Sequence, residues 1–179
     1  MARQAAGTMR GMSPPPGRRK GEHRRAKPEG SLMSSRPQPR PRTDYRHFIP
    51  IATRWHDNDL YGHVNNTVYY GFFDTAVNGY LIGAGALDIH AGPTIGLVVE
   101  TRCNYFEPLA FPQTLEAGLQ VAHLGSSSVR YEIGLFAEGA KRTAAHGHFV
   151  HVYVDRATRR PAKLPAPLLA ALQPLRAEA

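Results

Sequence analysis

The stretch from Arg54 to Leu81, RWHDNDLYGHVNNTVYYGFFDTAVNGYL, decides how this chain folds. It joins the predicted end of a strand, at Arg54 and Trp55, to an acidic turn, a pair of asparagines and an apolar helix. From Val68 to Leu81 the apolar residues recur at spacings of one, three and four, which is typical of one face of an α-helix. Such a face needs a partner to pack on, so the sequence predicts a helix that lies against a sheet.

Asn65 and Asn66 stand where this helix begins. Asparagine is favoured there because its side-chain oxygen accepts a hydrogen bond from an unpaired backbone N–H of the first turn. The unpaired amides and the helix dipole also favour negative charge. A carbonyl oxygen placed at this point would be polarised, and the carboxylate of Asp59, a few residues upstream, would attack it or activate a water molecule. These are the two halves of an acyl-transfer site.

The motif D-x-D-x-x-G-H-V-N-N-x-x-Y, residues 57–69, closely resembles that of the hotdog-fold thioesterases of the 4-hydroxybenzoyl-CoA thioesterase and acyl-CoA thioester hydrolase type. The order of elements matches this family over about residues 45–155. The resemblance implies an α+β hotdog fold, in which a curled antiparallel five-stranded sheet wraps around one long central helix. It also implies that Asp59 is the catalytic carboxylate and that backbone amides near residues 65–68 hold the thioester carbonyl.

Alternating apolar residues predict five strands, at Tyr45–Trp55, Ile95–Tyr105, Leu115–His123, Val129–Leu135 and Ala144–Val154. Short turns separate the last four strands, which indicates an antiparallel meander. Pro50 predicts an edge position or a bulge for the first strand, because proline cannot donate to a ladder. The second strand alternates in a single phase from Ile95 to Tyr105. Pro165–Leu175 is a predicted short terminal helix.

The net charge of +8 is confined to the first 44 residues, which carry eleven Lys and Arg against three acidic residues. The rest of the chain carries eleven of each and is neutral. Residues 1–44 are rich in proline and basic residues and poor in aliphatic ones, so they are predicted to be a disordered tail before a hotdog thioesterase domain at residues 45–179. A neutral domain has no electrostatic footprint for nucleic acid, so no nucleic-acid binding is expected of it.

The chain has one cysteine, Cys103, so it forms no intramolecular disulfide, and a reduced, cytoplasmic location is predicted. Cys103 itself suits the role of a small buried hydrophobe. No stretch approaches the ~20 apolar residues of a membrane span, so none is predicted.

The predicted site residues fall into two groups. Those predicted to take part in catalysis are Asp59, His63, Asn65 and Asn66, and those predicted to bind the substrate are Tyr69, Phe73, Tyr105, Ser127, Ser128 and Arg130. His63 is included because imidazole titrates near neutral pH, whereas Asp57 is expected to stabilise the turn. His56, Asp57, Asp59 and His63 match no metal-ligand spacing, so neither a metal nor a cofactor is expected beyond the coenzyme A of the substrate.

Three functions are compatible with these residues. The preferred one is hydrolysis of a small-molecule acyl thioester, carried by coenzyme A or an acyl carrier, with the acyl group not fixed. A hotdog enoyl-thioester hydratase would pair an Asp with a His five positions on, whereas His63 follows Asp59 by four. The third is a non-catalytic module that binds acyl thioesters. In each case a homodimer or homotetramer is expected, because one helix covers only one face of the sheet.

Overall fold

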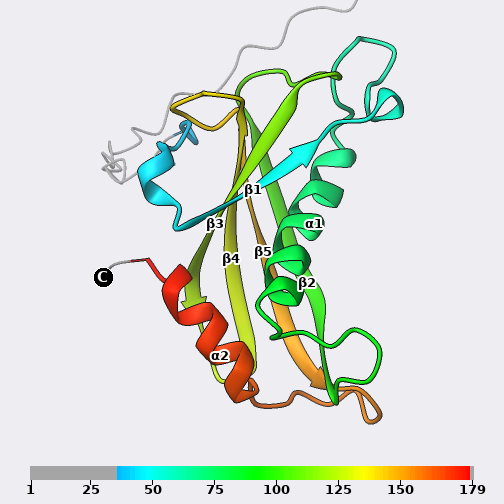
Figure 1. Ribbon diagram of the computed structural model, residues 1–179, viewed down its shortest axis with the longest axis vertical. Helices are drawn as coiled ribbons and strands as arrows, with labels where there is room; N and C mark the ends of the chain where they lie inside the picture. The colour runs from blue at the N-terminus through cyan, green and yellow to red at the C-terminus, as the bar shows by residue number, and fades with distance from the viewer. Residues whose placement is uncertain (1–35, 178–179) are drawn as a thin grey trace, which may run out of the picture. The chain divides into compact units, whose positions relative to one another are not determined.

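The computed structural model describes residues 36–177, which form an α+β arrangement of one five-stranded antiparallel sheet and two helices (Figure 1). The strands are β1 (His47–Ala52), β2 (Thr94–Tyr105), β3 (Thr114–Leu124), β4 (Ser128–Ala137) and β5 (Ala145–Asp155), in the spatial order β1-β3-β4-β5-β2. The helices are α1 (Val68–Gly83) and α2 (Ala166–Leu172), with 3₁₀ turns at Arg42–Asp44, Trp55–Asp57 and Gln173–Leu175. Within this part of the chain, no helix is long and apolar enough to cross a membrane.

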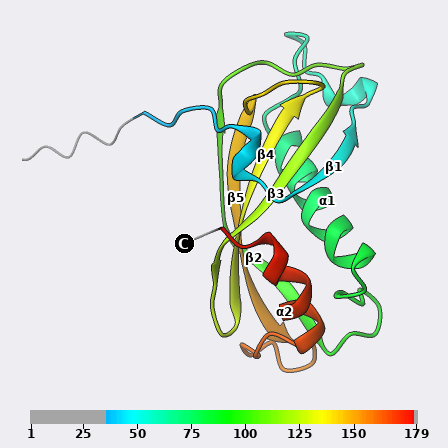
Figure 2. The same cartoon turned by 60° about the vertical axis from the view of Figure 1, so that its left-hand side comes forward.

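Both helices lie on one face of the sheet (Figures 1 and 2). Phe73 and Leu81 of α1 are buried in the same core cluster as Leu168 and Leu172 of the C-terminal helix. The hydroxyl of Tyr80 donates to the carbonyl of Ala171 at 2.6 Å, which ties the two helices together.

The expectation of one long central helix is therefore corrected, because α1 has 16 residues and shares the face with α2. A helix of that length spans about 24 Å. A strand of 11 residues, such as β3, spans about 36 Å. Val129 of the sheet belongs to the same buried cluster as Leu168 and Leu172 of α2.

The first strand is shorter than predicted. β1 ends at Ala52, and Trp55, which was expected to continue it, opens a 3₁₀ turn with its side chain 80% exposed. The turn forms because the carboxylate of Asp57 accepts a hydrogen bond from the backbone N–H of Arg54 at 2.7 Å. β1 lies at one edge of the sheet, as Pro50 predicted.

β2 contains a bulge that the alternating pattern did not predict. Its register with β5 shifts between Val98 and Glu100. Before the bulge Gly96 pairs with Tyr153, and after it Thr101 pairs with Phe149. Because one extra residue reverses the alternation, the prediction of a single phase from Ile95 to Tyr105 was wrong.

Residues 36–44, assigned by the sequence to the basic tail, belong to the same compact unit as the sheet. The guanidinium of Arg42 holds both carboxylate oxygens of Glu116 on β3, at 2.7 and 3.2 Å, and Arg40 pairs with Asp44 at 2.7 Å. These contacts extend the folded part upstream of the predicted boundary at residue 45. Residues 1–35 lie outside the described residues, and disorder there stays a prediction.

Candidate active site

The acidic turn before α1 forms a closed loop. The N–H of Asp59 donates to the carbonyl of His63 at 2.8 Å, and the N–H of Asn65 donates to the carbonyl of Asp57 at 2.8 Å. Gly62 supplies the φ of 81° that the turn requires, a value that residues with a Cβ rarely adopt. The loop therefore holds Asp59 close to the residues that open α1.

Asp57 anchors this loop from inside the protein. Its side chain is fully buried, and it accepts hydrogen bonds from the backbone N–H of Arg54 at 2.7 Å and from the Arg54 guanidinium at 2.9 Å. Burial alone would raise the pKa of Asp57, but the Arg54 hydrogen bonds and charge outweigh it and lower that pKa. The predicted turn-stabilising role of Asp57 is confirmed by these contacts.

Asp59 is only half-buried, and its two carboxylate oxygens differ. Oδ1 accepts a hydrogen bond from the N–H of Tyr61 at 2.8 Å, which stabilises the turn. Oδ2 has no hydrogen-bond partner among residues 36–177. Asp59 lines a pocket of about 890 Å³, together with Trp55, Asn58, Leu60, Tyr61, Gly62, Asn65 and Asn66. One carboxylate oxygen is thus available to a substrate or a water molecule.

Most backbone N–H groups next to the start of α1 already have hydrogen-bond partners. The N–H groups of Thr67 and Val68 donate to the side-chain oxygen and the carbonyl of Asn65, at 3.0 and 2.9 Å. The N–H of Asn65 is bonded to Asp57, as described above. This leaves the N–H of Asn66, for which the described part of the chain offers no partner.

The N-cap of α1 is Thr67, without a side-chain cap bond, so the expectation that Asn65 and Asn66 cap the helix was wrong. The side chain of Asn65 stabilises the turn before the helix instead. It accepts from both the backbone N–H and the hydroxyl of Thr67, the latter at 2.8 Å. The side chain of Asn66 is exposed. The backbone carbonyl of Asn66 accepts a hydrogen bond from the hydroxyl of Tyr105 at 3.1 Å. The Asn-x-Thr spacing was the sequence signal for this turn, since Asn side chains bond the backbone two residues on.

His63 is exposed, and only its backbone carbonyl bonds within the loop. It is not among the residues that line the Asp59 pocket. Across residues 36–177 no group of three or more His, Cys, Asp or Glu side chains is placed to hold an ion.

The predicted aromatic residues occupy different environments. Tyr69 and Phe73 are buried in the core, and burial raises the pKa of Tyr69 to about 12. Tyr105 is half exposed and packs edge-on against Tyr69, with ring centroids 4.9 Å apart. Sequence reasoning missed Leu60 and Tyr61, two strongly exposed residues at the Asp59 pocket. Their signal was an apolar pair inside an otherwise polar loop.

Three of the residues predicted to bind the substrate, Ser127, Ser128 and Arg130, lie elsewhere in the chain. Ser127 and Ser128 are at the turn from β3 to β4. The Asp59 loop is at the other end of β3, where the hydroxyl of Thr53 donates to the carbonyl of Gln113 at 2.6 Å. Arg130 bonds Glu132 at 2.7 Å on the sheet face opposite α1. Within one chain, the structure does not bring these three residues to Asp59.

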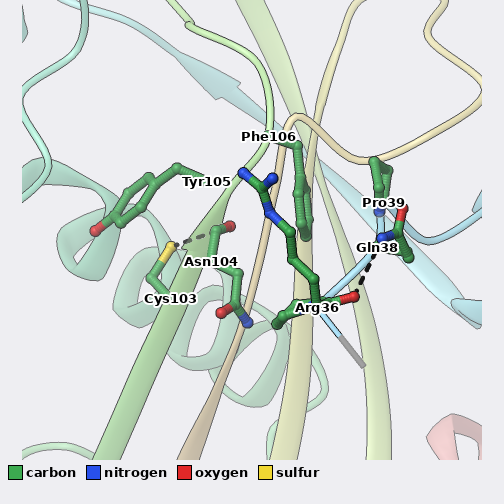
Figure 3. A pocket seen from close by; sticks show the side chains of 8 residues that line it. Arg36, Gln38, Pro39, Cys103, Asn104, Tyr105 and Phe106 are labelled. Carbon is green, nitrogen blue, oxygen red and sulfur yellow. Dashed lines mark hydrogen bonds between the residues drawn. The ribbon is translucent and has the colours of Figure 1, made fainter. Parts of the chain in front are cut away.

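A further pocket, of about 490 Å³, lies between residues 36–39 and 103–106 (Figure 3). Burial raises the pKa of the Cys103 thiol to about 11, so the thiol is protonated at neutral pH. Its sulfur donates weakly to the carbonyl of Asn104 at 3.9 Å. This environment suits the predicted role of Cys103 as a small hydrophobe.

Comparisons with known proteins agree with this fold. The family model of the thioesterase-like superfamily matches residues 53–172. The PA5185 protein of Pseudomonas aeruginosa is 57% identical, with a TM-score of 0.77 over 79% of this chain and 99% of that chain. The PA2801 protein of the same organism, a candidate thioesterase, is 30% identical, with a TM-score of 0.66 over 71% and 98%.

A 1,4-dihydroxy-2-naphthoyl-CoA thioesterase from Synechocystis is 18% identical, with a TM-score of 0.64 over 70% of this chain and 93% of that chain, and so shares the fold. No curated protein matches the chain. The sheet, the helix and the Asp59 loop define a protein of the hotdog type. The chain belongs to the thioesterase-like superfamily.

Proposed function

We propose that this chain is a thioester hydrolase that cleaves an acyl-CoA or acyl-carrier thioester to a free acid and a thiol. One observation carries the proposal: the unpaired Oδ2 of Asp59 and the unpaired N–H of Asn66 belong to residues that line the same pocket. A carboxylate and an amide donor facing one cavity are the minimum that acyl transfer requires.

In the proposed reaction, the thioester carbonyl oxygen accepts a hydrogen bond from the N–H of Asn66. Asp59 either attacks the carbonyl carbon or removes a proton from a water molecule that attacks it. The carbonyl π electrons move to oxygen, and the oxyanion is stabilised by the amide and the start of α1. Collapse of this intermediate breaks the C–S bond, and the departing thiolate takes up the proton that the attacking water loses, which Asp59 returns in the general-base route. If Asp59 was the nucleophile, water then hydrolyses the anhydride.

The proposed assembly is a homodimer, or a homotetramer built from such dimers, formed through β2. This 12-residue edge strand has no neighbour on its outer side among residues 36–177. It exposes Leu97, Val98 and Val99, the last at 61%. A long apolar edge strand is a template for pairing, and a second copy presents the matching edge. Antiparallel pairing would bring the start of one β2 beside the end of the other, where Tyr105 contacts the Asp59 loop.

The hydratase alternative is weaker, because it needs Asp59 and His63 to act on one substrate. The side chain of His63 is not among those that line the Asp59 pocket.

The cytoplasmic location and the absence of any cofactor other than coenzyme A stay predictions from the sequence.

The proposed function is tested by identifying the products by mass after incubation of the full chain with a panel of acyl thioesters. We expect free thiol and free acid. A product that has gained one water and kept its C–S bond would indicate the hydratase. Tight binding of acyl-CoA without thiol release would indicate the non-catalytic module.

A further inference from the structure

A second, smaller cavity lies between the C-terminal half of α1 and the start of β2. Its volume is about 170 Å³. Its lining is apolar at Leu81, Leu87, Ile89 and Ile95 and polar at Asn78, His151 and Tyr153, with Gly96 completing it. None of these residues lines the Asp59 pocket.

His151 is an unpaired polar group in this cavity. Its side chain is 4% exposed, and Nε2 is buried without a hydrogen-bond partner among residues 36–177. The imidazole packs against the rings of Tyr131 and Phe149, at 5.2 and 5.8 Å between centroids. By contrast, the hydroxyl of Tyr153 is paired with that of Tyr131 at 2.8 Å. Buried polar groups are nearly always satisfied, so an unpaired one indicates a missing partner.

Gly96 keeps one edge of the imidazole accessible. A Cβ at this position would lie 3.2 Å from Nδ1 of His151, which is tighter than most real contacts. Burial lowers the pKa of His151, although the charge of Asp74 opposes this shift. The ring is therefore neutral at neutral pH, with one nitrogen that donates and one that accepts.

The other polar residue of the cavity is partly satisfied. Asn78 uses its amide N–H groups on α1 itself, donating to the carboxylate and the carbonyl of Asp74 at 2.9 and 3.0 Å. Among the polar residues of this cavity, His151 is thus the one with a buried nitrogen that has no hydrogen-bond partner among residues 36–177.

We propose that this cavity receives the far end of the acyl group, and that His151 is a specificity-determining residue that hydrogen-bonds a polar atom, such as a hydroxyl, carried by a ring-sized acyl group. The size is suitable, since an engineered protein cavity of about 150 Å³ accepts a benzene ring. This inference rests on the proposed thioester hydrolysis and on the proposed pairing of β2. In a single chain, the cavity lies about 15 to 20 Å along α1 from the helix start, where the Asp59 loop is.

The proposed dimer removes this separation. Antiparallel pairing sets the Gly96 end of one β2 beside the Tyr105 end of the other, and the hydroxyl of Tyr105 bonds Asn66. A thioester held at the Asp59 loop of one copy would then direct its acyl group into the His151 cavity of the other. A purely apolar acyl group would leave the imidazole unpaired, whereas a hydroxylated one would satisfy it.

The kinetic test compares benzoyl-CoA with its 3-hydroxy and 4-hydroxy derivatives in the full-length protein. We expect kcat/KM to favour one hydroxylated substrate by about threefold to tenfold, the range that one net hydrogen bond supplies. His151→Phe should bring this ratio close to one while benzoyl-CoA is still hydrolysed, and His151→Gln should keep part of the preference. His47→Phe, the same change at an exposed histidine of β1, should leave the ratio unchanged.

An unaltered ratio in His151→Phe, or no preference in the wild type, would overturn the inference while the hydrolase proposal stands. If the wild type hydrolyses none of the three thioesters but releases thiol from others of the panel, the inference fails while the hydrolase proposal stands. If it releases thiol from no member of the panel, the hydrolase proposal fails. The cavity is then tested by binding alone, with phenol and benzene as probes and the imidazole ¹⁵N resonances of His151 as the readout.

In that experiment phenol should bind more tightly than benzene and shift the His151 nitrogen resonances to saturation. This readout uses the wild-type protein, so it does not depend on whether a variant folds. Resonances that phenol leaves unmoved would indicate that the cavity holds water only, and the inference would be wrong.

Discussion

The N–H of Asn65 donates to the carbonyl of Asp57 at 2.8 Å, and this bond joins the turn that leads into α1 to the residue whose buried carboxylate anchors the acidic loop. Asp59 lies inside the loop that the bond closes. The position of the candidate catalytic carboxylate is therefore set by a contact between two of its neighbours in the chain.

Removing the Asp57 anchor should loosen this loop and destabilise the protein. Asp57→Ala deprives the Arg54 N–H of its acceptor and leaves a gap inside the protein. We expect a loss of about 1 to 3 kcal/mol in the free energy of unfolding, measured with urea. Asp88→Ala, which removes an exposed aspartate that caps the N–H groups of His90 and Ala91, should cost clearly less. Equal losses would show that the buried bonds of Asp57 contribute no more to stability than the exposed turn bonds of Asp88.

Glu132 should make the stability depend on pH. Burial raises its pKa, but hydrogen bonds from His146 and Arg130, each 2.7 Å long, outweigh this and lower it. Because its ionised form is favoured in the folded state, its contribution is complete above the unfolded pKa of about 4.3 and is lost as the pH falls through the lower folded value. Urea titrations between about pH 6 and pH 3 should show a smaller decline for Glu132→Gln than for the wild type. Parallel curves would refute this role.

A charge on the outer edge of β2 should prevent self-association. Val99→Glu places a carboxylate where a second copy would pair, and burying it there without a partner is unfavourable. Sedimentation analysis should give a dimer or tetramer for the wild type and a monomer for the variant. Ile82→Glu, at a comparably exposed position on α1, should not change the assembly. A wild type that sediments as a monomer would contradict the proposed pairing.

The elements of this fold were predictable where local pattern decides them. The helix expected from Val68 begins at that residue, and the predicted strands lie within a few residues of those observed. The bulge between Val98 and Glu100 was not predictable, because the apolar alternation of β2 continues unbroken through the extra residue. The position of α2 was not predictable either, because it depends on which part of the sheet face α1 leaves uncovered.

The candidate site was also predictable only in its local features. The motif placed Asp59 on a loop next to a helix start, which is a local property of the sequence. It could not show that Asn66 keeps the unpaired amide, because that depends on which neighbouring N–H groups are taken by Asp57 and Asn65. The His151 cavity depends on Gly96 facing it from another strand, a pairing that only the folded sheet provides.

The central claim, that the carboxylate of Asp59 cleaves thioesters, is tested most directly by thiol release from Asp59→Asn. Asparagine keeps an oxygen that can accept from the N–H of Tyr61, so the loop should persist while the negative charge is lost. We expect kcat/KM to fall by about 100- to 10,000-fold. Asp155→Asn, which changes an aspartate with the same kind of turn bond to Thr158, should release thiol at the wild-type rate. If Asp59→Asn also does so, Asp59 is not the catalytic carboxylate.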